Sequence, residues 1–584
     1  MGFVAPDLPD LDHDEWSRRP YSERLKPLAQ HWVEHGFGTP SAIYLVYVLK
    51  IGLYVAGAAW FISMTPGLGG LGDIDVWWDQ PIVYQKLVVW TLLFEVAGFG
   101  CGWGPLTSRF VPPMGAFLYW LRPGTIRLAP WPDKVPGTGG TTRTWFDVAL
   151  YAGVLGTAVW LLAQPGDGVA VTAGDTVGLL DPVAALPLIA TLGLLGLRDK
   201  TIFLAARGEQ YWVTLFVFFL PFVDMIIAFK LVMLALWWGA ATSKLNHHFP
   251  HVVAVMMSNS PLIRSRWVKR KMYRNAPDDL QPSAIPRTMA HVGTAVEYLV
   301  PAYLVFLGDG GTLTWAALIF MVVFHLHILS TVPMGVPLEW NVFFIFSLFY
   351  LFGTYGETQI WDMTTPATLL VLIPLVGLPL LGNVRPEKVS FLPAMRYYAG
   401  NWATSAWYFK GDAEQRMDAA LTTTSPLPVD QLRMLYPDET VQLFLAKVMA
   451  WRSLHSHGRA HAGLTRRIIG DGDGWTVRDG EIVAGYALGW NFGEGHLHNG
   501  QLLAAVQERC DFEPGELVVM VLESQPIQTQ TQQYRVYDAN LGLLEEGYVR
   551  VSDMLSRQPW PEAGDVFPVH DVRTFGPSVP SGQG

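Results

Sequence analysis

Long apolar segments recur from residue 41 to residue 384, and they limit the folds open to this chain more than any other feature. A run of about 20 apolar residues is the length that an α-helix needs to cross a bilayer. The chain is 51% hydrophobic and 15% charged, and it contains 24 tryptophans, a residue that favours membrane interfaces. The sequence therefore predicts a polytopic α-helical protein of the cell membrane, multi-pass, with about nine or ten spans.

The loops between the predicted spans carry charges that indicate an orientation. Basic loops favour the cytoplasmic side, and the acidic loop Glu357 to Asp362 is expected outside. The basic loop 264–287 and the chain after Arg385 then both fall inside, as does the N-terminus. The spans are predicted at residues 41–63, 84–102, 144–163, 181–197, 289–307, 312–330, 337–353 and 367–384.

The run from Tyr211 to Lys244 decides the number of spans. To keep the basic loops inside, this run must enter the membrane and return as a hairpin of two short helices, with a break near Pro221 and Asp224. The alternative is one tilted helix, which gives nine spans and places the C-terminal domain outside. Counting positive charges favours the hairpin.

The two ends of the chain differ from the apolar middle, residues 41–384. Residues 1–40 are polar and amphipathic, which suits a helix lying at the interface. Residues 385–574 are predicted to form an α+β extramembrane domain, because helical spacing over 428–469 precedes several strand-like runs. The strand-like runs are 481–488, 516–522, 532–537 and 544–551, with a hairpin turn at 538–542. The tail 575–584 is rich in Pro, Gly and Ser and is predicted to be disordered.

Charge and cysteine usage exclude several classes of function. Residues 411–584 hold 23 acidic and 13 basic side chains, an excess that equals the net charge of -10 of the whole chain. Nucleic acid is not expected as a partner of so acidic a surface. Membrane lipids are expected partners, and the C-terminal domain is a candidate surface for a protein partner. Cys101 and Cys510 are too far apart to suggest a zinc motif or a disulfide framework.

Lys244 stands where a long apolar run meets a basic segment. Three histidines follow it closely, at His247, His248 and His251. Ionisable groups at membrane depth are candidates for functional sites. The structural alternative is that Lys244 extends to the lipid headgroups while the histidines cap a helix end.

Further ionisable residues lie inside predicted spans, at Glu95, His291, Glu297, His325 and His327. Because histidines two residues apart point to different faces of a helix, only one of His325 and His327 is expected to share a cavity with Glu297. We take Lys244, Glu297 and His325 as the candidate site, with a desolvated lysine acting as the base. A neutral buried histidine bound to a carbonyl group is the structural alternative.

The histidines also invite comparison with the His boxes of membrane di-iron desaturases. Those enzymes need boxes whose spacing repeats, and the spacing around His248 does not repeat. No metal site is therefore predicted. The pairs His455 with His457 and His496 with His498 are a separate hint of metal binding, for which surface or loop-lining roles are the alternative.

Several short motifs resemble the vitamin K-dependent γ-carboxylase-like superfamily of membrane proteins. Gly239-x-x-x-Ser243-Lys244-Leu245 is similar to that superfamily's Ala-Gly-x-x-Lys-Leu motif. The later elements follow in the same order, and they are Glu297-Tyr298-Leu299-Val300-Pro301, Phe324-His325 and Val332-Pro333-Met334-Gly335. The full length also resembles an uncharacterised actinobacterial transmembrane family.

The resemblance to the carboxylase implies a role for one residue. In the carboxylase the matching lysine is the base that deprotonates reduced vitamin K, so Lys244 is expected to act as a base and a reduced quinone as its cofactor. Residues 246–250 depart from the family's Asp-x-x-Trp continuation, so peptide carboxylation is not expected. The carboxylase also carries its soluble domain on the non-cytoplasmic side, opposite to the orientation indicated by the charges.

The leading hypothesis from the sequence is a membrane enzyme that acts on an isoprenoid quinone or another lipid, with Lys244 as base. A first alternative is a non-catalytic lipid-handling or transport-accessory protein of the cell envelope. A second alternative is a metal-dependent lipid oxygenase or desaturase. The residues do not decide whether the protein is an enzyme.

Overall fold

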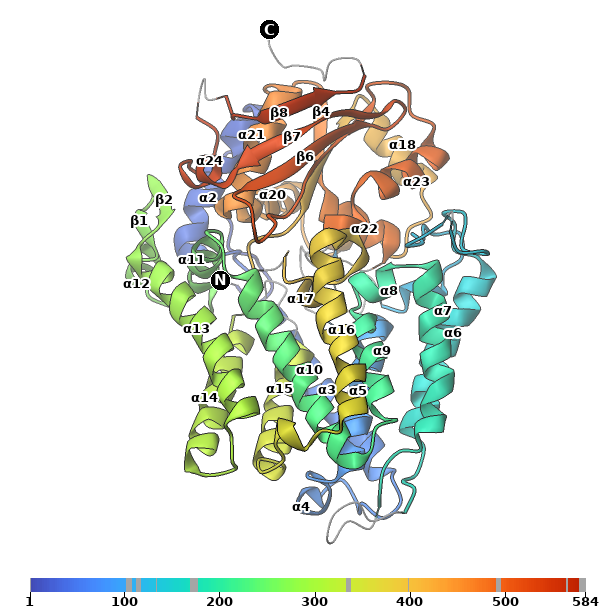
Figure 1. Cartoon of the computed structure of the whole chain (residues 1–584). Helices are drawn as coiled ribbons and strands as arrows, with labels where there is room; N and C mark the ends of the chain where they lie inside the picture. Colours follow the sequence, from blue (N-terminus) through green and yellow to red (C-terminus); the bar gives the residue numbers. More distant parts are fainter. Residues whose placement is uncertain are drawn as a thin grey trace.

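The computed structural model describes residues 2–100, 108–111, 117–132, 134–168, 177–331, 338–396, 399–489, 495–562 and 566–576. A bundle of helices forms one half of the molecule, and a region of helices and strands covers one end of that bundle (Figure 1). We call residues 399–576 the C-terminal region and the end of the bundle that it covers the capped end. The cavity described below lies between the two parts.

In the described part of the chain, seven helices are long and apolar enough to cross a membrane. They are α3 (Ser41–Ser63), α5 with its π-helical extension (Pro81–Phe94 and Glu95–Phe99), α6 (Trp145–Leu162), α10 (Phe222–Ser243), α13 (Ala284–Phe306), α14 (Thr312–Leu329) and α16 (Thr365–Val384). The same described residues include two shorter apolar helices, Pro182–Arg198 (containing α7, Leu186–Arg198) and Leu338–Thr354 (containing α15, Leu338–Ser347). The prediction of a polytopic helical membrane protein is confirmed.

The run from Tyr211 to Lys244 folds as a hairpin. Helix α9 (Gly208–Val217) ends before Pro221, and α10 begins at Phe222 and runs back toward the capped end (Figure 1). Proline has no backbone N–H to donate and fits poorly inside a helix, so it suits the position before α10. Asp224, expected at the break, lies in the first turn of α10 and accepts two hydrogen bonds of 2.8 Å from Thr364.

Short elements gather at the capped end of the bundle. The basic segment contains α12 (Arg266–Arg270) and the antiparallel pair β1 (Tyr273–Asn275) and β2 (Asp279–Pro282). Gln281 at the end of this pair donates hydrogen bonds to the carbonyls of Leu555 (2.8 Å) and Arg557 (2.6 Å). The basic segment and the C-terminal region therefore lie at the same end, as the charge pattern predicts. Other short helices are not confined to this end, since α4 (Ile74–Trp77) lies at the opposite end (Figure 1). The rest are η3 (Tyr119–Leu121), α8 (Thr201–Leu204), α11 (Phe249–Asn259), η6 (Ile360–Asp362), η7 (Pro386–Lys388) and α17 (Phe391–Ala394).

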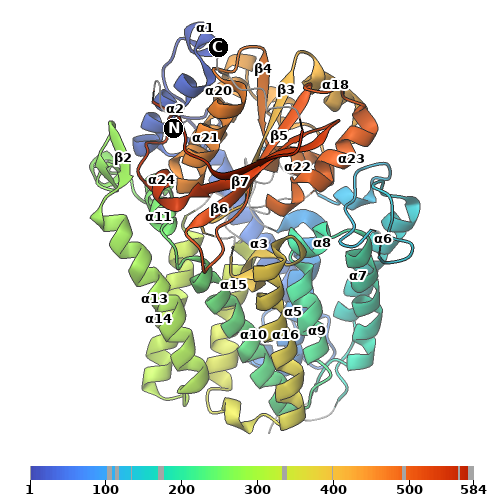
Figure 2. The same ribbon diagram turned by 45° about the horizontal axis from the view of Figure 1, so that its top comes forward.

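The C-terminal region is built around one antiparallel sheet with strand order β4-β3-β5-β6-β7-β8. Alternate side chains of a strand point to opposite faces of the sheet. Both faces of this sheet pack against helices. One face, with Ala406 and Val518, packs on α21 and α24, and the other, with Trp407 and Val519, faces α22 and α23 (Figure 2). The strands are β3 (Thr404–Lys410), β4 (Trp475–Asp479), β5 (Leu517–Leu522), β6 (Thr531–Asp538), β7 (Gly542–Arg550) and β8 (His570–Thr574).

Three of the predicted strands are confirmed, but the run 481–488 was wrongly predicted as a strand. It forms helix α22 (Gly480–Leu488), which begins where the Asp479 carboxylate accepts the backbone N–H of Glu481 at 2.9 Å. Such an N-cap favours a helix, and nearly every side chain of α22 is buried, so the apolar pattern alone does not distinguish helix from strand. The helices of this region are α18 (Ala413–Ala420), α19 (Pro428–Arg433), α20 (Asp438–Leu454), α21 (Ser456–Ile469), α22, α23 (Gly500–Cys510) and α24 (Val551–Leu555), with η8 at Gly495–Leu497.

The N-terminal helices α1 (His13–Arg18) and α2 (Tyr21–His35) lie on the C-terminal region. Trp16 and Leu28 are buried against Leu443 and Ala450 of α20. The amphipathic character found in the sequence thus serves contact within the protein. The tail predicted to be disordered lies outside the described residues from Pro577 onward.

Candidate functional site

Lys244 lies at the C-terminal end of α10, next to α13. Asn246 donates a side-chain hydrogen bond of 2.6 Å to the carbonyl of Ser243, which turns the chain away from the helix. The Lys244 ammonium group donates a short hydrogen bond to the carboxylate of Glu297. Both side chains are largely buried, with 10% and 4% of their surface exposed. Two of the three predicted site residues are therefore in direct contact, as an ion pair.

A cavity of about 360 Å³ lies beside this ion pair, between the bundle and the C-terminal region. Most of its lining is aliphatic, aromatic or methionine side chains, and its polar lining includes Lys244, His327, Thr331 and His455. The apolar lining comes from α11 (Phe249, Val252, Val253, Val255, Met256, Met257), α13 (Met289, Val292, Gly293, Val296), α14 (Phe320, Phe324, Ile328) and the C-terminal side (Ala399, Trp402, Trp451). Such a composition suits an apolar ligand that carries one polar group.

The cavity reaches the exposed surface of the bundle at α13 and α14. Val292 on α13 and Phe320 on α14 both line it, yet they are 57% and 51% exposed. Both helices also present large apolar side chains to the outside, among them Leu299 and Val323. The apolar cavity wall therefore continues into the exposed apolar surface of α13 and α14.

His325 does not share this cavity, although the sequence placed it there. Its Nε2 accepts a hydrogen bond of 3.0 Å from the indole N–H of Trp237, and its Nδ1 lies 2.9 Å from the side-chain oxygen of Asn341. Because Nε2 accepts, the neutral ring donates from Nδ1, and both nitrogens are satisfied. The histidine of α14 that lines the cavity is His327, two residues later on another face of the helix.

The three histidines after Lys244 have separate surroundings. His247 is exposed. His248 is buried, and its ring nitrogens lie 2.6 Å from the Ser456 hydroxyl and 2.8 Å from the Gln525 side-chain oxygen. Burial lowers the pKa of His248 to about 4, so this ring is neutral at physiological pH. His248 therefore joins α11 to the C-terminal region.

Comparison with known proteins adds one finding. A family model described as a transmembrane protein of unknown function (DUF3556) matches residues 1–572. The chain belongs to the DUF3556 family. No curated protein and no solved structure matches it. The resemblance to an uncharacterised transmembrane family is thus confirmed, whereas the match does not extend to the carboxylase-like superfamily; the fourth element of that resemblance, residues 332–335, lies outside the described residues.

This DUF3556 chain also buries a group of charges that sequence reasoning found only in part. Arg207 at the start of α9 lies 2.7 Å from a carboxylate oxygen of Glu95 and 4.0 Å from one of Glu339. Lys50 of α3 lies 3.3 Å from the other oxygen of Glu339. Only Glu95 was noted in the sequence, yet all four are charged residues in or beside apolar helices, which is the signal that could have found them. The group joins four helices.

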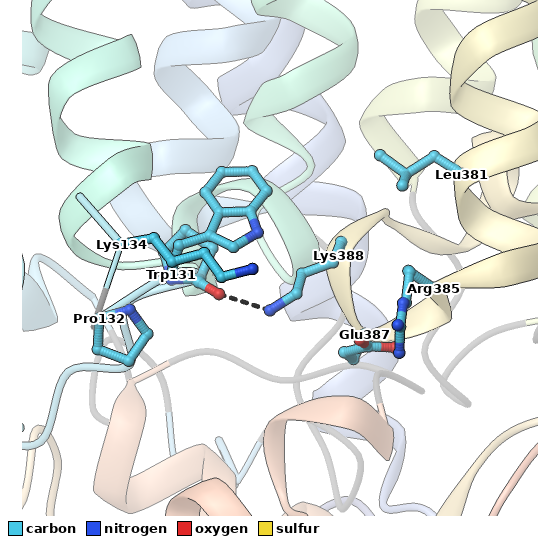
Figure 3. Close-up of a pocket in the computed structure, with 8 residues that line it drawn as sticks. Trp131, Pro132, Lys134, Leu381, Arg385, Glu387 and Lys388 are labelled. Carbon is cyan, nitrogen blue, oxygen red and sulfur yellow. Dashed lines mark hydrogen bonds between the residues drawn. The ribbon is translucent and has the colours of Figure 1, made fainter.

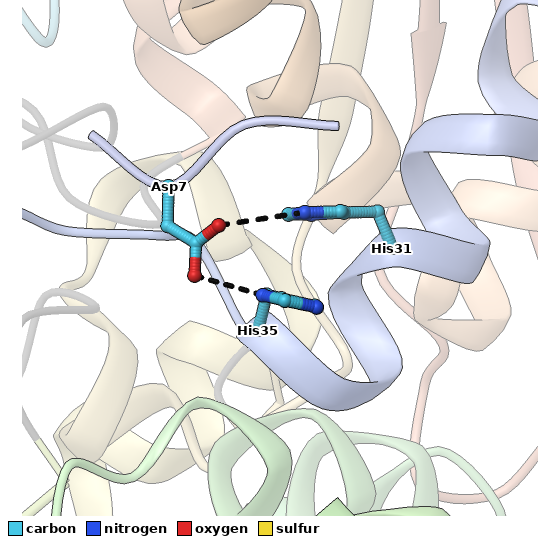
Figure 4. A group of neighbouring side chains, drawn as sticks. All are labelled: Asp7, His31 and His35. Carbon is cyan, nitrogen blue, oxygen red and sulfur yellow. Dashed lines mark hydrogen bonds and ion pairs between the residues drawn. The ribbon is translucent and has the colours of Figure 1, made fainter. Parts of the chain in front are cut away.

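One cluster in the described part of the chain has the residue types of a metal site. His31 and His35 are one turn apart on α2, with stacked rings, and both face Asp7 (Figure 4). The Asp7 carboxylate lies 3.7 Å from Nε2 of His31 and 2.8 Å from Nδ1 of His35. The Lys447 amine lies 3.3 Å from the other nitrogen of His31. These contacts hold the N-terminal segment on α2 and α20, far from Lys244 in the sequence.

Proposed function

We propose that this protein binds an amphipathic lipid of the cell membrane, of the isoprenoid quinone class or similar, in the cavity beside Lys244. The observation that carries the proposal is an apolar cavity that reaches the exposed apolar surface of α13 and α14 and has Lys244, ion-paired with Glu297, in its wall. The apolar part of the ligand would replace water against α13 and α14. The polar head would lie against Lys244, where an ammonium group can donate to a carbonyl or phosphate oxygen.

The same contact supports an enzyme that moves a proton on this lipid. When an apolar ligand excludes water, a buried ion pair loses stability relative to its neutral form, a free amine beside a carboxylic acid. Lys244 would then be the base and Glu297 would hold the proton. Residues 239–245 resemble the carboxylase motif that contains the catalytic lysine, and this resemblance supports the role of Lys244 as base. His327 and His455 are the other titratable groups of the cavity wall.

The alternative is a lipid-handling protein without catalysis. Trp402 and Trp451 of the C-terminal region form part of the cavity wall, so a bound lipid would contact both this region and the helix bundle. Such a lipid could change the surface that the C-terminal region offers to a protein partner of the cell envelope. In this case Lys244 and Glu297 would fix the headgroup only.

Filling the cavity tests lipid binding. A side chain at Gly293 would meet no atom within 4 Å of its Cβ, and Gly293 lines the cavity. We expect Gly293→Leu to leave folding unchanged and to remove the quinone or similar lipid of this cavity, which mass spectrometry detects in the purified protein. Gly52 on α3 is equally unobstructed but exposed, so Gly52→Leu is the matched control. Equal lipid content in the two variants would contradict the proposal.

Substitution of Lys244 tests catalysis separately from binding. Arginine keeps the charge but does not give up its proton, so Lys244→Arg should retain the lipid and lose turnover. Turnover is followed as a change in absorbance or mass of the bound quinone or lipid, with Lys271→Arg, an exposed position, as the control. Turnover in Lys244→Arg equal to that of the control would exclude Lys244 as the base and leave the lipid-handling role.

A further inference from the structure

A second pocket, of about 390 Å³, lies at the capped end of the bundle, where helix α16 ends. Its wall is made by the end of α16 and the residues just after it, together with the segment around Trp131 (Figure 3). The lining residues are Pro130, Trp131, Pro132, Lys134, Leu381, Arg385, Glu387 and Lys388. It shares no lining residue with the cavity beside Lys244.

Three cations and one carboxylate face this pocket. Within the described residues, Lys134, Arg385 and Lys388 have no carboxylate oxygen within ion-pairing distance, although Glu387 also lines the pocket. Lys388 donates a hydrogen bond to the carbonyl of Pro130 and lies 5.7 Å from the centre of the Trp131 ring. Burial lowers the pKa of Lys388, and the positive charges of Arg385 and Lys134 lower it further, whereas the Glu387 carboxylate raises it. The pocket therefore has positive charge that is not neutralised within it; Asp133 lies outside the described residues.

The position of the pocket suits a lipid headgroup. Arg385 follows the last residue of α16, and Leu381, one turn earlier on the helix, lines the pocket and is 40% exposed. Leu380 and Val384 continue an exposed apolar surface along the same helix. Tryptophan and basic residues beside an apolar helix surface mark the level at which hydrocarbon meets water.

We propose that this pocket binds the phosphate group of an anionic phospholipid, whose acyl chains lie along α16. Arg385 can bind two phosphate oxygens at once, and Lys388 adds a partly buried point charge. Basic pockets beside membrane helices attract anionic headgroups through such charges. The exposed apolar surface of α16 beside the cations favours a lipid over a soluble phosphate compound.

Competition between lipids tests the proposal on the full-length protein. In nanodiscs of mixed phosphatidylglycerol and phosphatidylcholine, native mass spectrometry should show retained phosphatidylglycerol. The double variant Arg385→Gln/Lys388→Gln should weaken that retention roughly thirtyfold, since each basic side chain contributes to headgroup attraction. Arg264→Gln/Lys271→Gln, at exposed positions of the basic segment, is the matched control and should retain the lipid.

A variant that is expected to bind more lipid serves as a control, because misfolding of the double variant could also lower its lipid retention. Glu387→Gln removes the one carboxylate of the pocket, so it should raise retention of phosphatidylglycerol. No preference for phosphatidylglycerol over phosphatidylcholine, an equal loss in the control, or lower retention in Glu387→Gln would each overturn the proposal. Displacement of phosphatidylglycerol by an equal concentration of glycerol 3-phosphate would show a soluble phosphate site instead. Gly293→Leu should leave retention here unchanged, so this test is independent of the proposed function.

Discussion

Lys244 and Glu297, 53 residues apart in the sequence, form an ion pair that joins the end of α10 to the middle of α13. The pair is largely buried beside an apolar cavity. Two charges removed from water in this way depend on each other, because either one alone would be a buried unpaired charge. The pair therefore couples the packing of two helices to the wall of the cavity.

Removing one partner of this pair should destabilise the protein more than removing both. Breaking a buried ion pair by a single substitution costs roughly 3–5 kcal/mol, whereas an apolar replacement of both partners is often tolerated. We expect Lys244→Met and Glu297→Leu each to lower the thermal unfolding midpoint, measured by fluorescence in detergent. The double variant should recover much of the loss. Additive losses would show that the two side chains do not depend on each other.

The buried histidines predict loss of stability in acid. The folded-state pKa of His248 is about 4, below the value of about 6.5 for an exposed histidine, so the unfolded chain binds the proton first as the pH falls. The stability that the neutral ring gives is complete above about pH 6.5 and is lost as the pH falls toward 4, by up to about 3 kcal/mol. His455, with a pKa lowered to about 3 by burial, acts in the same direction.

The pH effect is measured as the difference in unfolding midpoint between pH 7.5 and pH 5. His248→Gln should reduce that difference, because glutamine does not titrate. The exposed neighbour His247 gives the control, and His247→Gln should leave the difference as in the unsubstituted protein. The same pH difference in both variants would contradict the role given to His248.

The group around Arg207 should be needed for assembly of the bundle. Arg207→Met removes the cation that contacts both Glu95 and Glu339, whereas Lys50 pairs with Glu339. The loss of this ion pair leaves Glu95 buried without the partner that balances its charge. We expect a loss of roughly 3–5 kcal/mol or more, seen as a low yield of monodisperse protein and a lower unfolding midpoint. Arg264→Met, at an exposed position, should behave like the unsubstituted protein. Similar yields of the two variants would remove the structural role.

Labelling of single cysteines tests the orientation in the membrane. Helix α12, which ends at Arg270, and strand β4, which begins two residues after Asp473, lie at the capped end of the molecule, whereas α4, which contains Asp75, lies at the opposite end (Figure 1). With Cys101 and Cys510 replaced by serine, Arg270→Cys and Asp473→Cys should resist a membrane-impermeant thiol reagent in intact cells, and Asp75→Cys should react. Reaction at both capped-end positions would reverse the predicted orientation. Reaction at only one of them would contradict their common side.

The sequence by itself determined the membrane-spanning helices. Apolar segments must become helices in a bilayer, because every backbone polar group has to be satisfied within the segment. The predicted spans at 41–63, 289–307 and 312–330 accordingly agree with α3, α13 and α14 to within a few residues. Pro221 marked the break between α9 and α10, and alternating side chains marked β6 and β7. These are local properties of the chain.

Only the tertiary structure decided which side chains meet. Glu297 and His325 both lie in apolar helices, yet Glu297 reaches Lys244 while His325 turns to Trp237 and Asn341. Arg207 meets Glu95, 112 residues earlier, through the packing of α5 and α9. The reason is geometric: a helix is specified by local pattern, but the rotation and depth at which it packs against another helix depend on side chains far away in the sequence.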